Sequence, residues 1–105
     1  MDISQLIKGR RKKLSTPKQK KIIELFRNLF TSGFHLAEII DFLRRSALLE
    51  ETYVAEMRSG LAAGQSFSQI MKRLGFSDNV VTQLSLSELH GNLNLSLGKI
   101  EDYLE

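Results

Sequence analysis

The stretch from Leu84 to Tyr103 constrains the fold most, because it combines helical periodicity with one clear interruption. At the interruption, His90-Gly91-Asn92, the Gly tolerates the left-handed conformation that ends a helix, and the Asn suits the first cap of the next one. Beyond it, apolar residues recur at i, i+4, i+7 and i+11, the spacing of a single helical stripe. The stretch therefore predicts two consecutive helices, and the inward face of the second is made by Leu93, Leu97, Ile100 and Leu104.

Glu88 is the chemically unusual residue of this stretch, because it lies one turn beyond Leu84 on the face that Val81 and Leu84 make apolar. A carboxylate on a buried face is costly unless hydrogen bonds satisfy it. The nearest free donors in the sequence are the backbone N–H groups that begin the next helix, around Asn92 and Leu93. We therefore predict that Glu88 pins the start of the last helix. The plainer alternative is a carboxylate at a helix end, exposed to water.

Start and stop signals divide the rest of the chain into short helical segments. Ser15 followed by Pro17 marks the first start, and Ser66 and Ser77 are further caps. Glycines follow the apolar patterns and act as stops at Gly33, Gly64 and Gly75. The expected helices cover residues 18–31, 36–48, 51–62 and 67–74, with one more from Ser77 to the break.

Apolar residues at helical spacing predict the inward face of each of these segments. They are Ile22, Ile23, Phe26, Leu29 and Phe30, then Leu36, Ile39, Ile40, Leu43 and Ala47, then Val54, Met57 and Leu61, and then Phe67, Ile70, Met71 and Leu74. The segments and their short connections predict an all-α fold, an antiparallel bundle of about six helices with no strand.

Length and composition suit one globular domain and remove several classes of function. The chain has 105 residues, enough for a single core. It has no Cys, which excludes a disulfide framework, a thiolate zinc site and a Cys nucleophile. No apolar run approaches the length that spans a bilayer, and no apolar segment of a signal peptide follows the basic amino end. The cytoplasm is therefore the expected compartment.

Charge is distributed unevenly along the chain. The first 21 residues hold eight basic residues and one acidic residue, whereas the remainder holds seven basic and eleven acidic residues. We interpret residues 1–16 as a basic, flexible arm that contacts an anionic membrane face, an acidic protein surface or nucleic acid. A solvated, disordered arm without a partner is the plainer alternative. The eight basic residues of the first 21, which we expect to contact the membrane or a partner, are Lys8, Arg10, Arg11, Lys12, Lys13, Lys18, Lys20 and Lys21.

No pattern in the sequence indicates an enzyme. There is no phosphate-binding Gly loop with a Lys and no His-Glu-x-x-His helix. Glu88 and His90 do not form half of a metal site, because residues two apart on a helix do not share a face. His35 lies at a turn, with no second candidate ligand nearby. We therefore expect no catalytic residue, no metal site and no cofactor.

Three stretches together resemble the type II secretion F-type domain. Ser87–Leu93 is similar to its Gly-Glu-x-Ser/Thr-Gly-x-Leu signature, with Ser87 in place of the first Gly and His90 in place of the hydroxyl residue. Gly64–Ile70 fits a Gly-x-Ser-hydrophobic-x-x-hydrophobic pattern of the same family, and Thr31–Leu36 resembles the turn after its first helix. The resemblance covers about Lys18 to Tyr103.

The resemblance implies that residues 17–105 are the first cytoplasmic domain of an inner-membrane assembly-platform protein, excised from spans absent from this chain. Such proteins serve type IV pili, secretion pseudopili and competence pili, and this sequence looks most like the competence branch, which serves DNA uptake. The implied partners are the hexameric assembly ATPase, other proteins of the pilus or secretion machinery, and further copies of the same protein. The implied location is the cytoplasmic face of the membrane, with this fragment soluble. The implied structural or interface residues are Gly33, Gly64, Ser66, Glu88, Gly91 and Leu93.

The alternative interpretation is a small helical nucleic-acid-binding domain with a basic amino-terminal arm. A pI of about 9.4 suits phosphate contacts. Against it, the body of the chain is acidic, and no aromatic residue interleaves the basic run to offer a stacking surface. The most regular predicted helix carries only Arg44 and Arg45, both near its end. Direct contact with nucleic acid is therefore the less favoured expectation.

Overall fold

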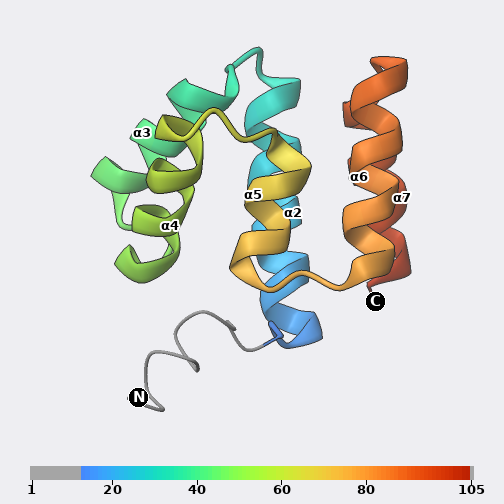
Figure 1. Cartoon of the computed structure of the whole chain (residues 1–105), viewed down its shortest axis with the longest axis horizontal. Helices are drawn as coiled ribbons and strands as arrows, with labels where there is room; N and C mark the ends of the chain where they lie inside the picture. The colour runs from blue at the N-terminus through green and yellow to red at the C-terminus, as the bar shows by residue number, and fades with distance from the viewer. Residues whose placement is uncertain (1–12, 105) are drawn as a thin grey trace.

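Residues 13–104 are described by the structure, a computed structural model, and this part of the chain forms six α-helices and no strand. Consecutive helices alternate in direction (Figure 1), so the predicted all-α antiparallel bundle is confirmed. The helices are α2 (Thr16–Thr31), α3 (Leu36–Ser46), α4 (Glu51–Ala62), α5 (Phe67–Leu74), α6 (Asp78–His90) and α7 (Leu93–Tyr103).

Helices α2 and α5 form the centre of the bundle, with the α3–α4 hairpin on one side and the α6–α7 hairpin on the other (Figure 1). The Phe67 ring of α5 packs against two rings of α2, with centroids 4.9 Å from Phe26 and 5.5 Å from Phe30. The Phe30 pair is edge-to-face and the Phe26 pair is tilted, and an edge-to-face pair stabilises beyond the area that it buries. The nearest helices to α5 are α4 and α6, and the ring contacts of Phe67 add α2 to its packing.

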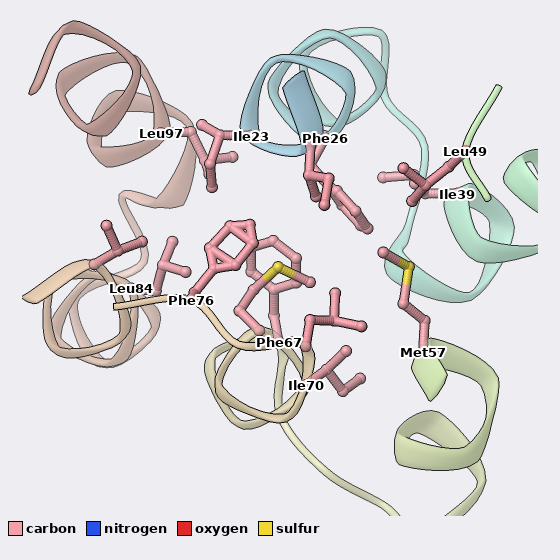
Figure 2. Close-up of a cluster of buried hydrophobic side chains, with 14 of the residues drawn as sticks. Ile23, Phe26, Ile39, Leu49, Met57, Phe67, Ile70, Phe76, Leu84 and Leu97 are labelled. Atoms are coloured by element: carbon pink, nitrogen blue, oxygen red, sulfur yellow. The ribbon is translucent and has the colours of Figure 1, made fainter. Parts of the chain in front are cut away.

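One apolar core runs through the bundle from α4 to α7. Figure 2 shows side chains of α2, α5, α6 and α7 converging around Phe67 and Phe76, and Met57 of α4 closing the other end. The predicted stripe of the last helix is correct, since Leu97, Ile100 and Leu104 are buried and Leu93 is partly buried. On α6 the core position is held by Val80, with Val81 only partly buried.

Helix α3 ends two residues earlier than expected, and Ala47 is not on its inward face. Ala47 adopts φ 57°, a left-handed conformation that a non-glycine residue adopts with strain. The turn that it makes leaves Leu48 46% exposed and turns Leu49 into the core. The prediction for Ala47 was therefore wrong, because helical spacing continued past the residue at which the backbone leaves the helix.

Packing begins earlier than the predicted boundary between arm and domain. Leu14 is buried, and its N–H donates to the carbonyl of Gly75 at 2.9 Å. The buried Gln19 side chain donates to the Leu14 carbonyl at 2.8 Å and accepts from the Ser77 N–H at 3.4 Å. One amide side chain thus ties the start of the domain to the α5–α6 connection, a role that sequence periodicity does not reveal.

The predicted helix caps behave differently from one another. The Ser15 hydroxyl accepts from the Lys18 N–H at 3.3 Å, as a helix cap does. Ser77 and Asn92 occupy the cap positions of α6 and α7, but neither side chain makes a capping hydrogen bond.

Within residues 13–104, none of the helices combines the length and the apolar character that crossing a lipid bilayer requires.

Candidate functional site

The first turn of α5 carries the densest polar network that involves the predicted site residues. Ser66 is its N-cap, and the Ser66 hydroxyl accepts from the Gln69 N–H at 3.3 Å. The Gln69 side chain returns a bond by accepting from the Ser66 N–H at 2.8 Å. This reciprocal arrangement is a capping box, and it satisfies two of the donors that a helix start leaves open.

Glu88 completes this network from the last turn of α6. One of its carboxylate oxygens accepts from the Ser68 backbone N–H at 2.6 Å, and the other accepts from the Ser68 hydroxyl at 3.2 Å. The Ser68 and Ser66 hydroxyls are 3.1 Å apart. A carboxylate that accepts a backbone N–H at a helix start gains both a charge-assisted hydrogen bond and a favourable position in the helix dipole.

The predicted partner of Glu88 was therefore wrong, although its role as a hydrogen-bond acceptor was right. The prediction assigned it to the start of α7, which follows it in the sequence, but Glu88 pins the start of α5 instead. Because α5 and α6 are antiparallel neighbours joined by a short link, the end of α6 lies beside the beginning of α5 (Figure 1). The start of α7 is tied by backbone alone, through the Asn92 N–H donating to the Ser87 carbonyl at 3.2 Å.

The other structural residues expected from the sequence lie at turns around this junction or farther away. Gly64 has φ 77° just before the α5 cap, and Gly91 has φ 70° at the end of α6. Leu93 is partly buried at the first position of α7. Gly33, with φ 95°, belongs to the α2–α3 turn and is not part of the junction.

Ser87, which stands where the family signature has Gly, is buried beside the junction. Its hydroxyl donates to the carbonyl of Gln83, one turn earlier in α6, at 2.6 Å. The hydroxyl is thus satisfied within its own helix, as a buried polar group requires. His90, the second departure from the signature, is exposed and takes no part in the network.

The basic residues expected to form an arm are only partly within the described residues. Lys8, Arg10, Arg11 and Lys12 lie outside them. Lys13 and Lys21 are exposed, and Lys20 is half-buried on α2. Lys18 is held in the bundle, 2.7 Å from the Glu50 carboxylate and 5.8 Å from the centroid of the Tyr53 ring. The hydrogen bond from Lys18 lowers the pKa of Glu50. Because Lys18 lies near the start of α2 and Glu50 just before α4, the pair connects the starts of these two helices.

Two further ion pairs join neighbouring helices of the bundle. Arg27 on α2 lies 2.6 Å from the Glu101 carboxylate on α7, which raises the pKa of Arg27. Arg73 on α5 lies 2.6 Å from the Glu56 carboxylate on α4. The first pair joins residues 74 positions apart and the second joins residues 17 apart on successive helices, so spacing within one helix could identify neither. In residues 13–104 there is no group of three or more His, Asp or Glu side chains placed to hold a metal ion.

Ser68 is the functional residue that the sequence analysis missed. It is buried and supplies both donors to Glu88, yet as a Ser inside a helical segment it carries no distinguishing spacing. Its place in the first turn after a Ser cap was the available signal, since donors are free there.

Comparison of the chain with protein-family models, with curated proteins and with solved structures found no match.

Proposed function

We propose that this chain is a helical scaffold domain of the type II secretion F class, the cytoplasmic part of an assembly platform for pilus-like fibres. In this role it contacts the hexameric assembly ATPase and other proteins of the machinery, and it associates with further copies of itself. The finer assignment to a competence pilus, and so to DNA uptake at the cytoplasmic face of the membrane, is part of the same proposal.

The observation that carries the proposal is the contact between Glu88 and Ser68. Two of the three stretches that resemble the family, Gly64–Ile70 and Ser87–Leu93, lie apart in the sequence but meet at this contact. The first pattern leaves the position of Ser68 open, and its specified polar residue, Ser66, is linked to Glu88 through the Ser68 hydroxyl. The contact therefore supports reading the two stretches as parts of one structural device.

The device suits a protein that transmits position rather than one that performs chemistry. Glu88 and the α5 capping box fix the end of α6 against the start of α5, and Gly91 then reverses the chain into α7. The α6–α7 hairpin is thereby held at a defined position on the central α2–α5 pair (Figure 1). A rigid hairpin of this kind can pass a displacement from one bound partner to another without internal slippage.

The test is direct binding between the purified chain and the purified assembly ATPase encoded in the same genome, measured by calorimetry. We expect saturable binding to the ATPase hexamer, with sedimentation of the free chain reporting self-association. In cells, loss of the gene should abolish fibre assembly and, for the competence assignment, uptake of DNA. Absence of ATPase binding together with salt-sensitive binding to duplex DNA would overturn the proposal in favour of the nucleic-acid alternative.

A further inference from the structure

The outward side of α6 presents two exposed leucines. Leu86 is 52% exposed and Leu89 is 79% exposed. Thr82 and Ser85 are exposed as well, and the four positions fall at i, i+3, i+4 and i+7, which is one side of a helix. We name Thr82, Ser85, Leu86 and Leu89 the α6 face. It contains no charged side chain, and the buried residues of α6 lie on the opposite side of the helix.

The pair of leucines distinguishes the α6 face from the rest of the described surface. The other large apolar side chains exposed in residues 13–104 belong to connections between helices or stand about two turns apart on α7, and they are Phe34, Leu48, Leu95 and Tyr103. Depletion of charge around apolar side chains is typical of the centre of an interface. Because a face without charge does not attract a charged partner, it suits an apolar occupant.

The first eight residues of the chain, which we name the amino-terminal segment, carry a matching apolar pattern. Ile3, Leu6 and Ile7 fall at i, i+3 and i+4, the spacing of one helical face. Asp2 stands just before this face and Gln5 three positions after Asp2, which is the arrangement of a capping box at a helix start. The pattern predicts a very short helix, and such a helix requires a surface on which its apolar face can pack.

The structure fixes the link between this segment and the bundle at the base of α6. Leu14 is buried, and its N–H donates to the carbonyl of Gly75, three residues before α6 begins at Asp78. Lys13 and Asp78 line one hollow at the same place. The last residue of the link therefore already lies beside the first residue of α6.

The link is long enough for the segment to reach the α6 face and short enough to keep it nearby. Residues 9–13 span up to about 17 Å when extended. Leu86 and Leu89 lie eight and eleven residues beyond Asp78, which is about 12 Å and about 17 Å along the helix. A short tether of this kind gives an effective concentration in the millimolar range, which a second copy of the chain in dilute solution does not match.

We propose that the amino-terminal segment docks on the α6 face of its own chain, as a short helix whose Ile3, Leu6 and Ile7 cover Leu86 and Leu89. A lipid surface suits the segment less well, because membrane binding scales with buried apolar area and three aliphatic side chains supply little of it. Docking leaves the basic residues that follow at the base of the bundle, where they can contact an anionic surface. The proposal stands independently of the assembly-platform proposal.

The experiment measures the distance between the segment and α6 in the full chain. The chain has no Cys, so Ser4→Cys gives a single attachment site for a nitroxide label, off the predicted apolar side. The label broadens the NMR signals of backbone amides near it. We expect broadening of residues 82–89 and none of α4, which lies on the other side of the bundle (Figure 1). Because the docking is apolar, the broadening should persist at about 0.5 M salt.

Matched variants of the labelled chain make the test specific to the two apolar surfaces. Leu89→Asp and Leu6→Asp should each abolish the broadening, whereas Leu95→Asp, the same change at an exposed leucine of α7, should leave it unchanged. Lys8→Gln should also leave it unchanged, because this variant removes a charge and no apolar contact. Thermal unfolding confirms that each variant is folded, and Leu89→Ser replaces Leu89→Asp if that variant is not.

Absence of broadening on α6, its loss at high salt, or its loss in Leu95→Asp as in Leu89→Asp would each overturn the proposal. Broadening of an isotope-labelled chain by a separate nitroxide-labelled chain would place the segment on a second copy instead. Binding to lipid vesicles that Leu6→Asp removes, without broadening on α6, would place the segment in a membrane and would overturn the proposal as well.

Discussion

The carboxylate of Glu88 lies 2.6 Å from the backbone nitrogen of Ser68 and 3.2 Å from its hydroxyl. This contact joins the last turn of α6 to the first turn of α5, across a separation of 20 residues in the sequence. The backbone N–H donors at the start of α5 are thus satisfied both by its own cap and by a side chain of the neighbouring helix. The arrangement explains how a helix of only eight residues is held at a fixed orientation in the bundle.

Removing the Glu88 carboxylate is expected to destabilise the domain measurably. Glu88→Ala leaves the donors of the buried Ser68 unsatisfied and should lower the free energy of unfolding by about 1.5–3 kcal/mol. Glu88→Gln, which keeps an acceptor but loses the charge, should cost less. Urea denaturation measures both, with Glu24→Ala on the exposed side of α2 as the control. A Glu88→Ala value within about 0.5 kcal/mol of wild type would contradict the pinning role.

Gly64 is expected to tolerate no side chain without strain, because its φ is 77°. A Cβ at this position would meet no atom within 4 Å, so the loss for Gly64→Ala comes from backbone conformation and not from a clash. We expect about 1 kcal/mol or somewhat more of destabilisation. A higher midpoint of thermal unfolding for the variant would show that the turn has been assigned wrongly.

Two glycines inside helices should respond to alanine with opposite signs. At Gly60 a Cβ would lie 2.8 Å from Cγ1 of Ile70, where α4 crosses α5, so Gly60→Ala should destabilise by about 1–3 kcal/mol. At Gly98 the nearest atom is 3.8 Å away, on Arg27, so Gly98→Ala should stabilise by about 0.5–1 kcal/mol. Thermal unfolding of both variants compares them directly, and equal shifts would contradict the close approach at Gly60.

The Lys18–Glu50 pair predicts a small dependence of stability on pH. Lys18 lowers the pKa of Glu50 below its ordinary value of 4.5, so the stabilisation is present above that value and is lost as pH falls through the lowered pKa. Because the Glu50 side chain is 48% exposed and the Lys18 side chain 26% exposed, water screens the pair, and the loss should be a few tenths of a kcal/mol. The difference in stability between wild type and Glu50→Gln should therefore shrink between about pH 7 and about pH 3. At about pH 7 this difference should be smaller in a Lys18→Met background, where the contributions of Lys21 and of the backbone remain. A difference between wild type and Glu50→Gln that does not change at low pH would argue against the pair.

The basic residues at the amino end are expected to bind an anionic surface. Lys8, Arg10, Arg11 and Lys12 should contribute roughly 1 kcal/mol each to binding of anionic vesicles at low salt. Flotation of the full chain should exceed that of a chain lacking residues 1–12, and neither should float with neutral vesicles. The truncation stops before Leu14, because its buried side chain and its bond to Gly75 belong to the domain. Equal flotation of the two chains with anionic vesicles would remove the lipid interpretation.

Local information in the sequence was sufficient for the helices and most of their inward faces. The limits of α4 and α5 match their expected positions, because a capping Ser, a terminal Gly and helical spacing are all properties of neighbouring residues. The same signals gave a wrong prediction for Ala47, because helical spacing placed it on the inward face although the helix ends at Ser46. They also did not predict the burial of Leu14. Its backbone is held by the buried Gln19 side chain and by the carbonyl of Gly75, which lies far along the chain.

The sequence by itself determined that this protein is an all-α bundle and that Glu88 is an unusual acceptor near a helix start. Only the tertiary structure decided which helix start it serves. The sequence points to the nearest free donors along the chain, whereas antiparallel packing brings the end of α6 beside the beginning of α5. Hydrogen bonds act over about 3 Å in space, so the partner is set by how helices pack and not by how closely residues follow one another in the chain.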